Sequence, residues 1–161
     1  MLKIRRANKK DALLYYEWAN EEAVRKQSFS TAIISLDDHI EWFEKKIIDP
    51  ECIMLIFENE LGLPAGQIRL QKEDEETYMI GISVDILSRG KGLATNMFKM
   101  ASDYLFSLFP QKKIVALIKE DNYPSIKSLE NAGYTHPLNI IFRGIKCIEY
   151  TKENTNANSG F

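Results

Sequence analysis

Residues 78–94 read Tyr78-Met-Ile-Gly-Ile-Ser-Val84-Asp85-Ile-Leu-Ser-Arg89-Gly90-Lys91-Gly92-Leu93-Ala94, and this stretch decides the fold. Its first half is a largely apolar run that predicts a strand over 78–84. Apolar side chains then recur at 93, 97, 100, 104 and 108, in steps of three or four, which predicts a long helix. Between the two lies a loop that contains two glycines and two cations.

This loop has the features of an anion-binding site. The start of a helix leaves several backbone N–H groups unpaired and carries a partial positive charge. Gly90 and Gly92 let the backbone approach a bulky anion, and Arg89 and Lys91 add charge. The pattern predicts a cradle for a pyrophosphate. The spacing of the glycines excludes a Walker phosphate-binding loop. A dinucleotide-binding fingerprint would need a glycine at position 95, where Thr95 stands. The alternative that this is simply a solvated loop joining strand to helix is not excluded.

The elements on either side of this loop predict a mixed α/β (α+β) domain. Asn8 and Ser35 are expected to cap helices, each with an acid three residues later (Asp11 and Asp38). Apolar positions 36, 40, 43 and 47 predict the buried stripe of the second of these helices. Strands are expected over 2–6, 52–57, 66–70, 113–118 and in 140–150, and a last helix over 122–132.

Length and composition limit the class of protein. The chain has 161 residues and a formal net charge of −2, which fits one domain (1–150) and argues against a nucleic-acid binder. The polar stretch 151–161 is expected to be a disordered tail. No apolar run is long enough for a bilayer, and no signal peptide is visible, so we expect a cytoplasmic protein without membrane association. Two cysteines and two histidines give no disulfide framework and no zinc-ligand spacing, so no metal is expected.

Arg89-Gly90-Lys91-Gly92-Leu93-Ala94 resembles the signature R/Q-x-x-G-x-G/A of the GCN5-related N-acetyltransferase (GNAT) superfamily. The segment Asp121–Tyr134 is similar to a second family motif, N-x-x-S/A followed by G-F/Y. The resemblance implies the GNAT fold, a mostly antiparallel mixed sheet flanked by helices. It also implies acetyl-CoA as the co-substrate.

The same resemblance implies a set of cofactor-binding residues. The Arg89–Ala94 amides would hold the pyrophosphate, and the strand edge at Ser83 to Asp85 would pair with the pantetheine. A backbone N–H there would stabilise the oxyanion formed during transfer. The expected residues are Ser83, Val84, Arg89, Gly90, Lys91, Gly92, Leu93, Ala94, Asn122 and Ser125.

The usual catalytic side chains of the family are missing. Many members have a glutamate on the fourth strand as the general base, and the equivalent position here is near Met79. Many also have a tyrosine that protonates the leaving thiolate, and Leu129 stands at that position. Asp85 and Tyr123 are the nearest residues that could take over these catalytic roles. Alternatively, Asp85 caps the loop and Tyr123 is a packing residue. A site without a dedicated base suits an amine of low pKa: an amine near pKa 8 is roughly a tenth neutral at pH 7, against about one in 2,500 for lysine.

The N-terminal third suggests the acceptor. Trp18-Ala-Asn20, Val24-Arg25, Ser28-Phe29 and His39-Ile-Glu-Trp42-Phe43 resemble the GNAT enzymes that acetylate nucleotide-linked 4-amino sugars of pseudaminic or legionaminic acid-type pathways. The resemblance implies direct acetyl transfer to a small amino sugar. Arg25, His39, Trp42 and Arg69 are the expected acceptor-binding residues, with core roles as the alternative for the aromatic ones and His39.

Three points stay open at this stage. N-terminal acetylation of a ribosomal or other protein is one alternative function, and a non-catalytic acyl-CoA-binding module is another. A homodimer is possible.

Overall fold

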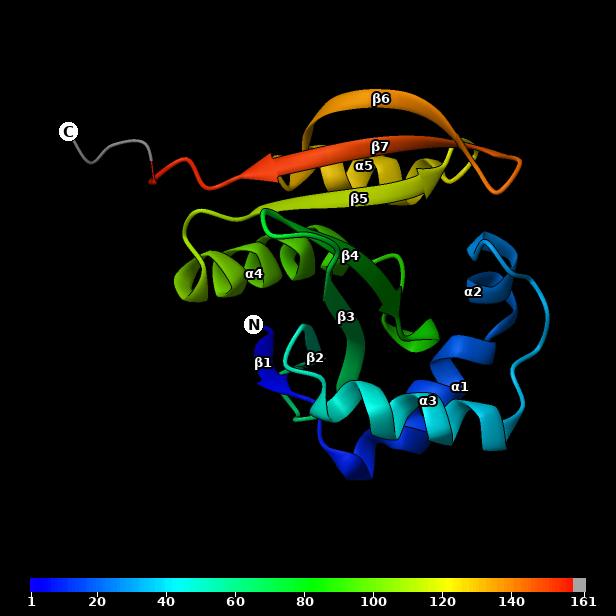
Figure 1. Cartoon of the computed structure of the whole chain (residues 1–161). Helices are drawn as coiled ribbons and strands as arrows, with labels where there is room; N and C mark the ends of the chain where they lie inside the picture. The colour runs from blue at the N-terminus through cyan, green and yellow to red at the C-terminus, as the bar shows by residue number, and fades with distance from the viewer. Residues whose placement is uncertain (158–161) are drawn as a thin grey trace.

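The computed structural model describes residues 1–157 and contains one seven-stranded sheet of order β1-β2-β3-β4-β5-β7-β6 (Figure 1). Every neighbouring pair is antiparallel except β4 and β5, which are parallel. This confirms the expected mixed α/β fold with a mostly antiparallel sheet. The strands are β1 (Lys3–Arg6), β2 (Cys52–Glu58), β3 (Pro64–Lys72), β4 (Thr77–Val84), β5 (Lys113–Lys119), β6 (Thr135–Phe142) and β7 (Ile145–Glu153).

Helices cover both faces of the sheet (Figure 1). Five are α-helices: α1 (Ala12–Asn20), α2 (Glu22–Gln27), α3 (Leu36–Ile48), α4 (Leu93–Leu108) and α5 (Tyr123–Asn131). Two short 3-10 helices are η1 (Lys9–Asp11) and η2 (Ile86–Ser88). In the described part of the chain, no helix combines the length and the apolar character needed to cross a bilayer.

The two faces of β2 divide the core. Leu55 and Phe57 pack with α4 residues such as Phe98 in the larger core, whereas Met54 and Ile56 pack against α1 and α3 in the smaller one. All of β2 up to Phe57 is buried, as a continuous apolar run predicts for a strand covered on both faces. Cys52 and Cys147 are buried free thiols.

The helix starts follow the sequence closely. Asn8 and Asp11 form the reciprocal capping box before α1, although the first turn is 3-10 (η1) rather than α. Ser35 caps α3 by accepting a hydrogen bond from the Asp38 N–H. The expected stripe of α3 needs correction, because Leu36 is 42% exposed whereas His39 is 2% exposed beside Phe43.

The C-terminal boundary also differs from the expectation. Thr151–Glu153 continue β7 instead of starting a disordered tail, because β7 pairs with β5 as far as Glu153. The Ile114–Lys152 and Lys113–Glu153 pairs of that ladder extend the strand. The rest of the expected tail is a turn up to residue 157, and 158–161 lie outside the described residues.

An ion-pair cluster fastens the start of α1 to the sheet. Arg5 on β1 donates two 2.9 Å hydrogen bonds to the carboxylate of Asp11 and a 2.7 Å bond to Glu58 on β2. Burial acts to raise the pKa of Asp11, but the hydrogen bonds from Arg5 and from the Asn8 N–H outweigh it and hold the pKa below its ordinary value. The ionised carboxylate therefore stabilises the folded chain.

We expect Asp11→Asn to lower the free energy of unfolding at pH 7 by about 2 kcal/mol, since it removes a charge-assisted, mostly buried pair. The folded-state pKa is depressed, so this contribution is present above the unfolded value of about 3.8 and is lost as pH falls through the folded one. Urea unfolding at pH 7 and at lower pH measures it. The control Glu41→Gln breaks an exposed pair with Lys45 and should change stability by less than about 0.5 kcal/mol.

Candidate active site

β4 and β5 separate from each other halfway along their length. Their parallel pairing runs from Thr77–Lys113 to Ile80–Ala116 and stops there. β4 stays paired with β3 up to Val84, and β5 stays paired with β7 up to Lys119. Residues 81–84 of β4 therefore have a neighbouring strand on one side only (Figure 1). We call this region, 81–84 and 117–119, the β4–β5 divergence.

Two helix starts flank the divergence. Because β4 and β5 are parallel, the helices that follow them, α4 and α5, begin at the same end of the sheet and pack on each other. Gly92 is the N-cap of α4 and has no side chain to accept its first N–H groups. Gly90 and Gly92 have φ of +74° and +71°, and a Cβ at either would meet no atom within 4 Å. The loop therefore presents unpaired amides to open space, as an anion cradle requires.

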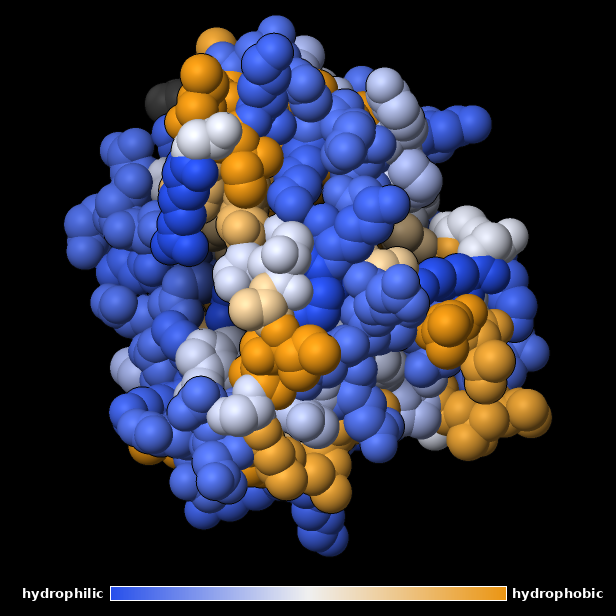
Figure 2. All heavy atoms as spheres, turned by 90° about the vertical axis from the view of Figure 1, so that its right-hand side faces the viewer, coloured by the Kyte–Doolittle hydropathy of each residue, from blue (hydrophilic) through white to orange (hydrophobic). Residues whose placement is uncertain are grey.

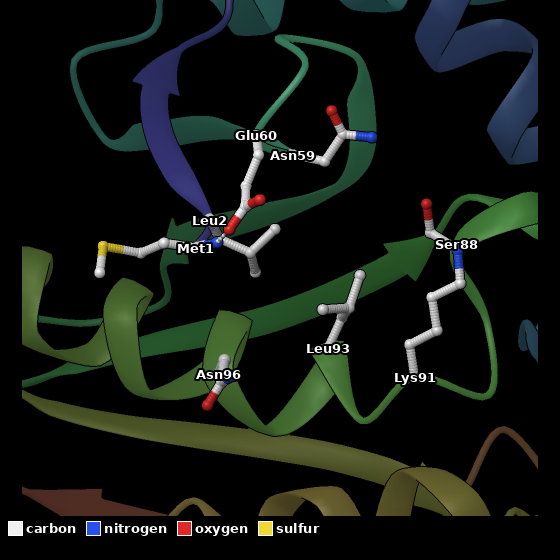
Figure 3. A pocket seen from close by; sticks show the side chains of 8 residues that line it. All are labelled: Met1, Leu2, Asn59, Glu60, Ser88, Lys91, Leu93 and Asn96. Carbon is white, nitrogen blue, oxygen red and sulfur yellow. Dashed lines mark hydrogen bonds and ion pairs between the residues drawn. The ribbon is translucent and has the colours of Figure 1, made fainter.

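A shallow hollow of about 260 Å³ lies beside this loop on the side of β1 (Figure 3). Its lining includes Ser88, Lys91 and Leu93 from the loop region, and Asn59 and Glu60 from the β2–β3 turn. Figure 3 shows Glu60 next to the amino group of Met1, with which it forms an ion pair. No residue of β5 or α5 lines this hollow, so it is not the β4–β5 divergence.

A polar surface on β3 and β4 continues the site on the other face of the sheet. Ile80, Ile82 and Val84 pack toward α4, so their neighbours on β4 face α1 and α3. Gly81 is exposed there, and a Cβ on it would meet nothing within 4 Å. We call this surface the β3–β4 floor. Its residues are Gln67, Arg69, Gln71, Met79, Gly81 and Ser83.

The floor contains one cation and no carboxylate. The Arg69 guanidinium lies 5.1 Å from the centre of the Trp42 ring of α3, a cation–π contact. Gln67 Nε2 donates a 3.2 Å hydrogen bond to Ser83 Oγ, and Gln67 Oε1 is buried without a hydrogen-bond partner. Two of the expected residues, Arg69 and Trp42, are thus brought together here.

α2 bridges the divergence from the loop to the β6–β7 turn. Lys119 Nζ at the end of β5 donates a 2.9 Å hydrogen bond to the Lys26 carbonyl. Phe29, just after α2, packs edge-on against Phe142 of β6, with ring centres 4.9 Å apart. This bridge was not predictable from the sequence, because its contacts join residues about a hundred positions apart. Figure 2 views the molecule from the side of α2 and shows a mostly hydrophilic surface with separate hydrophobic patches.

The side chains of Arg89 and Asp85 both have partners within the protein. Arg89 Nη2 binds Glu21 Oε2 at 2.6 Å, and its Nε binds the Val84 carbonyl at 3.1 Å. The Asp85 carboxylate accepts hydrogen bonds from Trp18 Nε1 (2.9 Å) and from the Leu87 N–H (3.0 Å). Asp85 is the N-cap of η2, which is the loop-capping alternative that the sequence left open.

Arg25 and His39 also have partners within the protein, whereas their expected role in binding the acceptor stays a prediction. The Arg25 guanidinium donates to the carbonyls of Ala19, Ser30 and Ala32 and so shapes the chain after α2. His39 Nε2 lies 2.9 Å from the Ala12 carbonyl. Burial lowers the pKa of His39, so its ring is neutral at pH 7 and joins α3 to α1.

The start of α5 contains the remaining predicted residues. Asn122 is the N-cap of α5, and its Oδ1 accepts a 3.4 Å hydrogen bond from the Ser125 N–H. Tyr123 is 73% exposed in the first turn, whereas Leu129 is fully buried in the core. The phenol of Tyr123 is thus accessible at the end of β5 where the divergence opens.

The sequence matches the family model described as acetyltransferase (GNAT) domain over residues 1–135. The chain belongs to the GNAT acetyltransferase family. It is therefore an acyltransferase, in agreement with the resemblance of the Arg89–Ala94 loop. Comparison with curated proteins finds none that matches.

Solved structures share the GNAT fold over nearly the whole chain. The spermidine N-acetyltransferase of Vibrio cholerae, in complex with CoA and spermine, has a TM-score of 0.87 at 18% identity and covers 97% of each chain. The aminoglycoside acetyltransferase AAC(6')-Ib with coenzyme A has a TM-score of 0.82 at 18% identity, covering 98% of this chain and 96% of its own. Its complex with coenzyme A and kanamycin gives 0.81, with the same identity and coverage.

Among residues 1–157, no group of three or more His, Cys, Asp or Glu side chains is placed to hold a metal ion.

We expect Lys91→Glu to weaken the binding of coenzyme A at least tenfold, because it reverses the one exposed cation between the two glycines of the loop. Titration calorimetry at low salt measures the affinity. The matched control is Lys99→Glu, an exposed lysine two turns into α4. An equal loss of affinity in both variants would refute a diphosphate site at this loop.

Proposed function

We propose that this GNAT domain is an acetyl-CoA-dependent N-acetyltransferase whose acceptor is a nucleotide-linked amino sugar. The observation that supports acetyl-CoA as the donor is the end of β4–β5 pairing at Ile80, together with the open amide loop 89–94 that follows β4 and η2. An unpaired strand edge suits the amides of an extended chain, and the loop amides suit a diphosphate. These are the two chemical features of the coenzyme A arm.

The chain's own groups would act mainly through hydrogen bonds. Because residues 81–84 stay paired with β3, only alternate backbone N–H groups of this stretch can point into the divergence. Such an N–H would stabilise the negative charge that develops on the oxygen of a thioester carbonyl held there. Ser83 Oγ, held by Gln67, adds a hydroxyl at the same place. Transfer forms the amide bond and breaks the thioester bond, while one proton passes from the amine, directly or through solvent, to the departing sulfur, so that coenzyme A leaves as the thiol.

The β3–β4 floor supports an acceptor with a low amine pKa. No carboxylate stands on the floor, and Met79 occupies the position where the family commonly has its base. Since the site offers no strong base there, an amine that is already partly neutral at pH 7 gains about 3 kcal/mol over a lysine-like amine. Electron-withdrawing oxygens next to the amine, as on a sugar ring, lower the pKa in this way.

The charge of the floor favours an anionic acceptor over a polycation. Arg69 is the sole charged residue of the floor, and its guanidinium can bind a phosphate while the Trp42 ring offers a flat apolar contact. Lys119 and Arg143 add cations at the end of β5 and in the β6–β7 turn. A nucleotide-linked amino sugar matches this set, since it combines a diphosphate, a base and an amine of low pKa.

The acceptor class is tested by following thiol release from acetyl-CoA with three amines at equal concentration. We expect kcat/KM for a UDP-linked 4-amino-4,6-dideoxy sugar to exceed that for spermidine by about a hundredfold, the pKa advantage worked out above. It should also exceed that for an N-terminal peptide, not through the pKa of the amine, which is similar, but because Arg69 can bind the phosphate that the peptide lacks. A preference for spermidine or for the peptide would refute the acceptor assignment alone. Absence of thiol release with every amine, together with no coenzyme A binding, would refute the donor as well.

Arg69→Met should raise the KM for the nucleotide sugar about tenfold or more, because one charge-assisted hydrogen bond to phosphate is lost. The KM for acetyl-CoA should stay within about twofold, since Arg69 lies on the floor and not at the loop. The matched control is Lys72→Met on the same strand, where the lysine pairs with Glu75 in the hairpin. Unchanged sugar KM in Arg69→Met would show that this cation does not bind the acceptor.

A further inference from the structure

α2 is a helix that cannot hold its position by packing. It has six residues, Glu22–Gln27, and none of their side chains is buried. A helix this short is unstable in isolation, because the cost of nucleating it is spread over too few hydrogen bonds. Its place over the β4–β5 divergence therefore depends on the polar and aromatic contacts at its two ends.

The C-terminal end of α2 has several such contacts that do not involve the cofactor loop. The Arg25 guanidinium binds three carbonyls on either side of the helix, and Ser28 Oγ bonds the Val24 carbonyl at 2.6 Å. Lys119 and the Phe29–Phe142 pair attach this end to β5 and β6. These contacts fix the end of α2 that lies near the β6–β7 turn.

At the N-terminal end, Arg25 Nε binds the Ala19 carbonyl of α1, and the Glu21 carboxylate is the group that joins α2 to the cofactor loop. Glu21 is the N-cap of α2, and its two oxygens accept hydrogen bonds from the Ala23 and Val24 N–H groups at 3.3 Å each. The same carboxylate binds Arg89 at 2.6 Å, and this hydrogen bond lowers the pKa of Glu21. Arg89 also binds the Val84 carbonyl at the end of β4. Glu21 thus joins α2 to the first residue of the loop and, through it, to the unpaired strand edge.

We propose that Glu21 is a positioning residue that couples occupancy of the Arg89–Ala94 loop to the placement of α2 beside the acceptor. The inference rests on the proposed function, because it takes the diphosphate of coenzyme A as the loop's ligand. A ligand that orders the loop also fixes the Arg89 backbone, so the guanidinium holds Glu21, and with it the start of α2, more firmly. By linkage, binding of the donor then strengthens binding of the acceptor, and the acceptor strengthens binding of the donor by the same factor.

The contact is arranged for this role rather than for stability alone. The Glu21 side chain is 22% exposed and that of Arg89 is 34% exposed, so the pair is partly solvated and contributes little to global stability. One hydrogen bond, from Trp18 Nε1 of α1 to the Asp85 carboxylate, also holds the loop from the α1 side. Loss of Glu21 should therefore free α2 without unfolding the loop.

Hydrogen exchange followed by mass spectrometry tests the coupling without any knowledge of the acceptor. In the wild-type chain, coenzyme A should slow exchange both in the loop segment 89–98 and in the α2 segment 22–28. In Glu21→Gln the loop should keep its protection and α2 should lose its own. The matched control is Glu22→Gln, which removes the same charge from the next, exposed residue and should behave as wild type. Arg89→Met breaks the pair from its other end and should also abolish protection of α2.

Steady-state kinetics give the second readout. With an amine that is turned over, Glu21→Gln should raise the acceptor KM about fivefold or more and leave the affinity for coenzyme A alone within about threefold. Thermal unfolding of each variant shows whether it folds. Protection of α2 that persists in Glu21→Gln, or that is absent in the wild type although coenzyme A binds, would overturn the coupling and leave the proposed function intact. Failure of coenzyme A to bind the wild type would overturn both.

Discussion

The one parallel strand pair of the sheet is the constraint on which the site depends. Parallel strands require a crossover, here α4, and place the carboxyl ends of β4 and β5 at the same end of the sheet. Each strand keeps an antiparallel partner after the two separate, β3 for β4 and β7 for β5, so both stay ordered beyond Ile80 and Ala116. The divergence thus exposes backbone groups on a strand that cannot collapse. An unpaired, rigid strand edge next to two helix starts is where an extended donor molecule can be bound by backbone groups alone.

The charged side chains around this edge mainly hold the scaffold. Asp85, Arg89 and Arg25 each make two or more hydrogen bonds to protein groups, and these bonds attach α1 and α2 to the loop and to each other. Partly buried charges need such partners, because desolvation without them is costly. The consequence is a site in which backbone amides, rather than side-chain acids and bases, are the groups left available for binding. That agrees with the neutral residues Met79 and Leu129 at the family's usual catalytic positions.

The sequence predicted what is encoded locally. The period of α4, the caps at Asn8 and Ser35, and the loop before Leu93 all depend on residues a few positions apart, and the structure confirms them. The partners of charged groups were not predictable, because Glu21–Arg89 and Trp18–Asp85 join residues 68 and 67 positions apart. For charged residues such as Arg89 and Asp85, the sequence shows only the residue type and not the partner, so their roles could be predicted only from the residue type. Glu21 is the exception, because it stands directly before α2 and is the N-cap of that helix. Its capping role is a local feature that the sequence analysis did not recognise.

The fold is shared by solved structures with different bound amines, so in our proposal the acceptor is chosen by side chains on the floor of the site. The solved relatives share this backbone, and their structures hold spermine or kanamycin, which are polycations. Here the β3–β4 floor offers Arg69 as its one charge and has no carboxylate. Two like charges about 6 Å apart at an effective dielectric constant of about 20 repel by about 3 kcal/mol, a factor of roughly a hundred in affinity. For the proposed acceptor, a negative group near Arg69 would gain a comparable amount, so Arg69 would favour an anionic amine over a polycation.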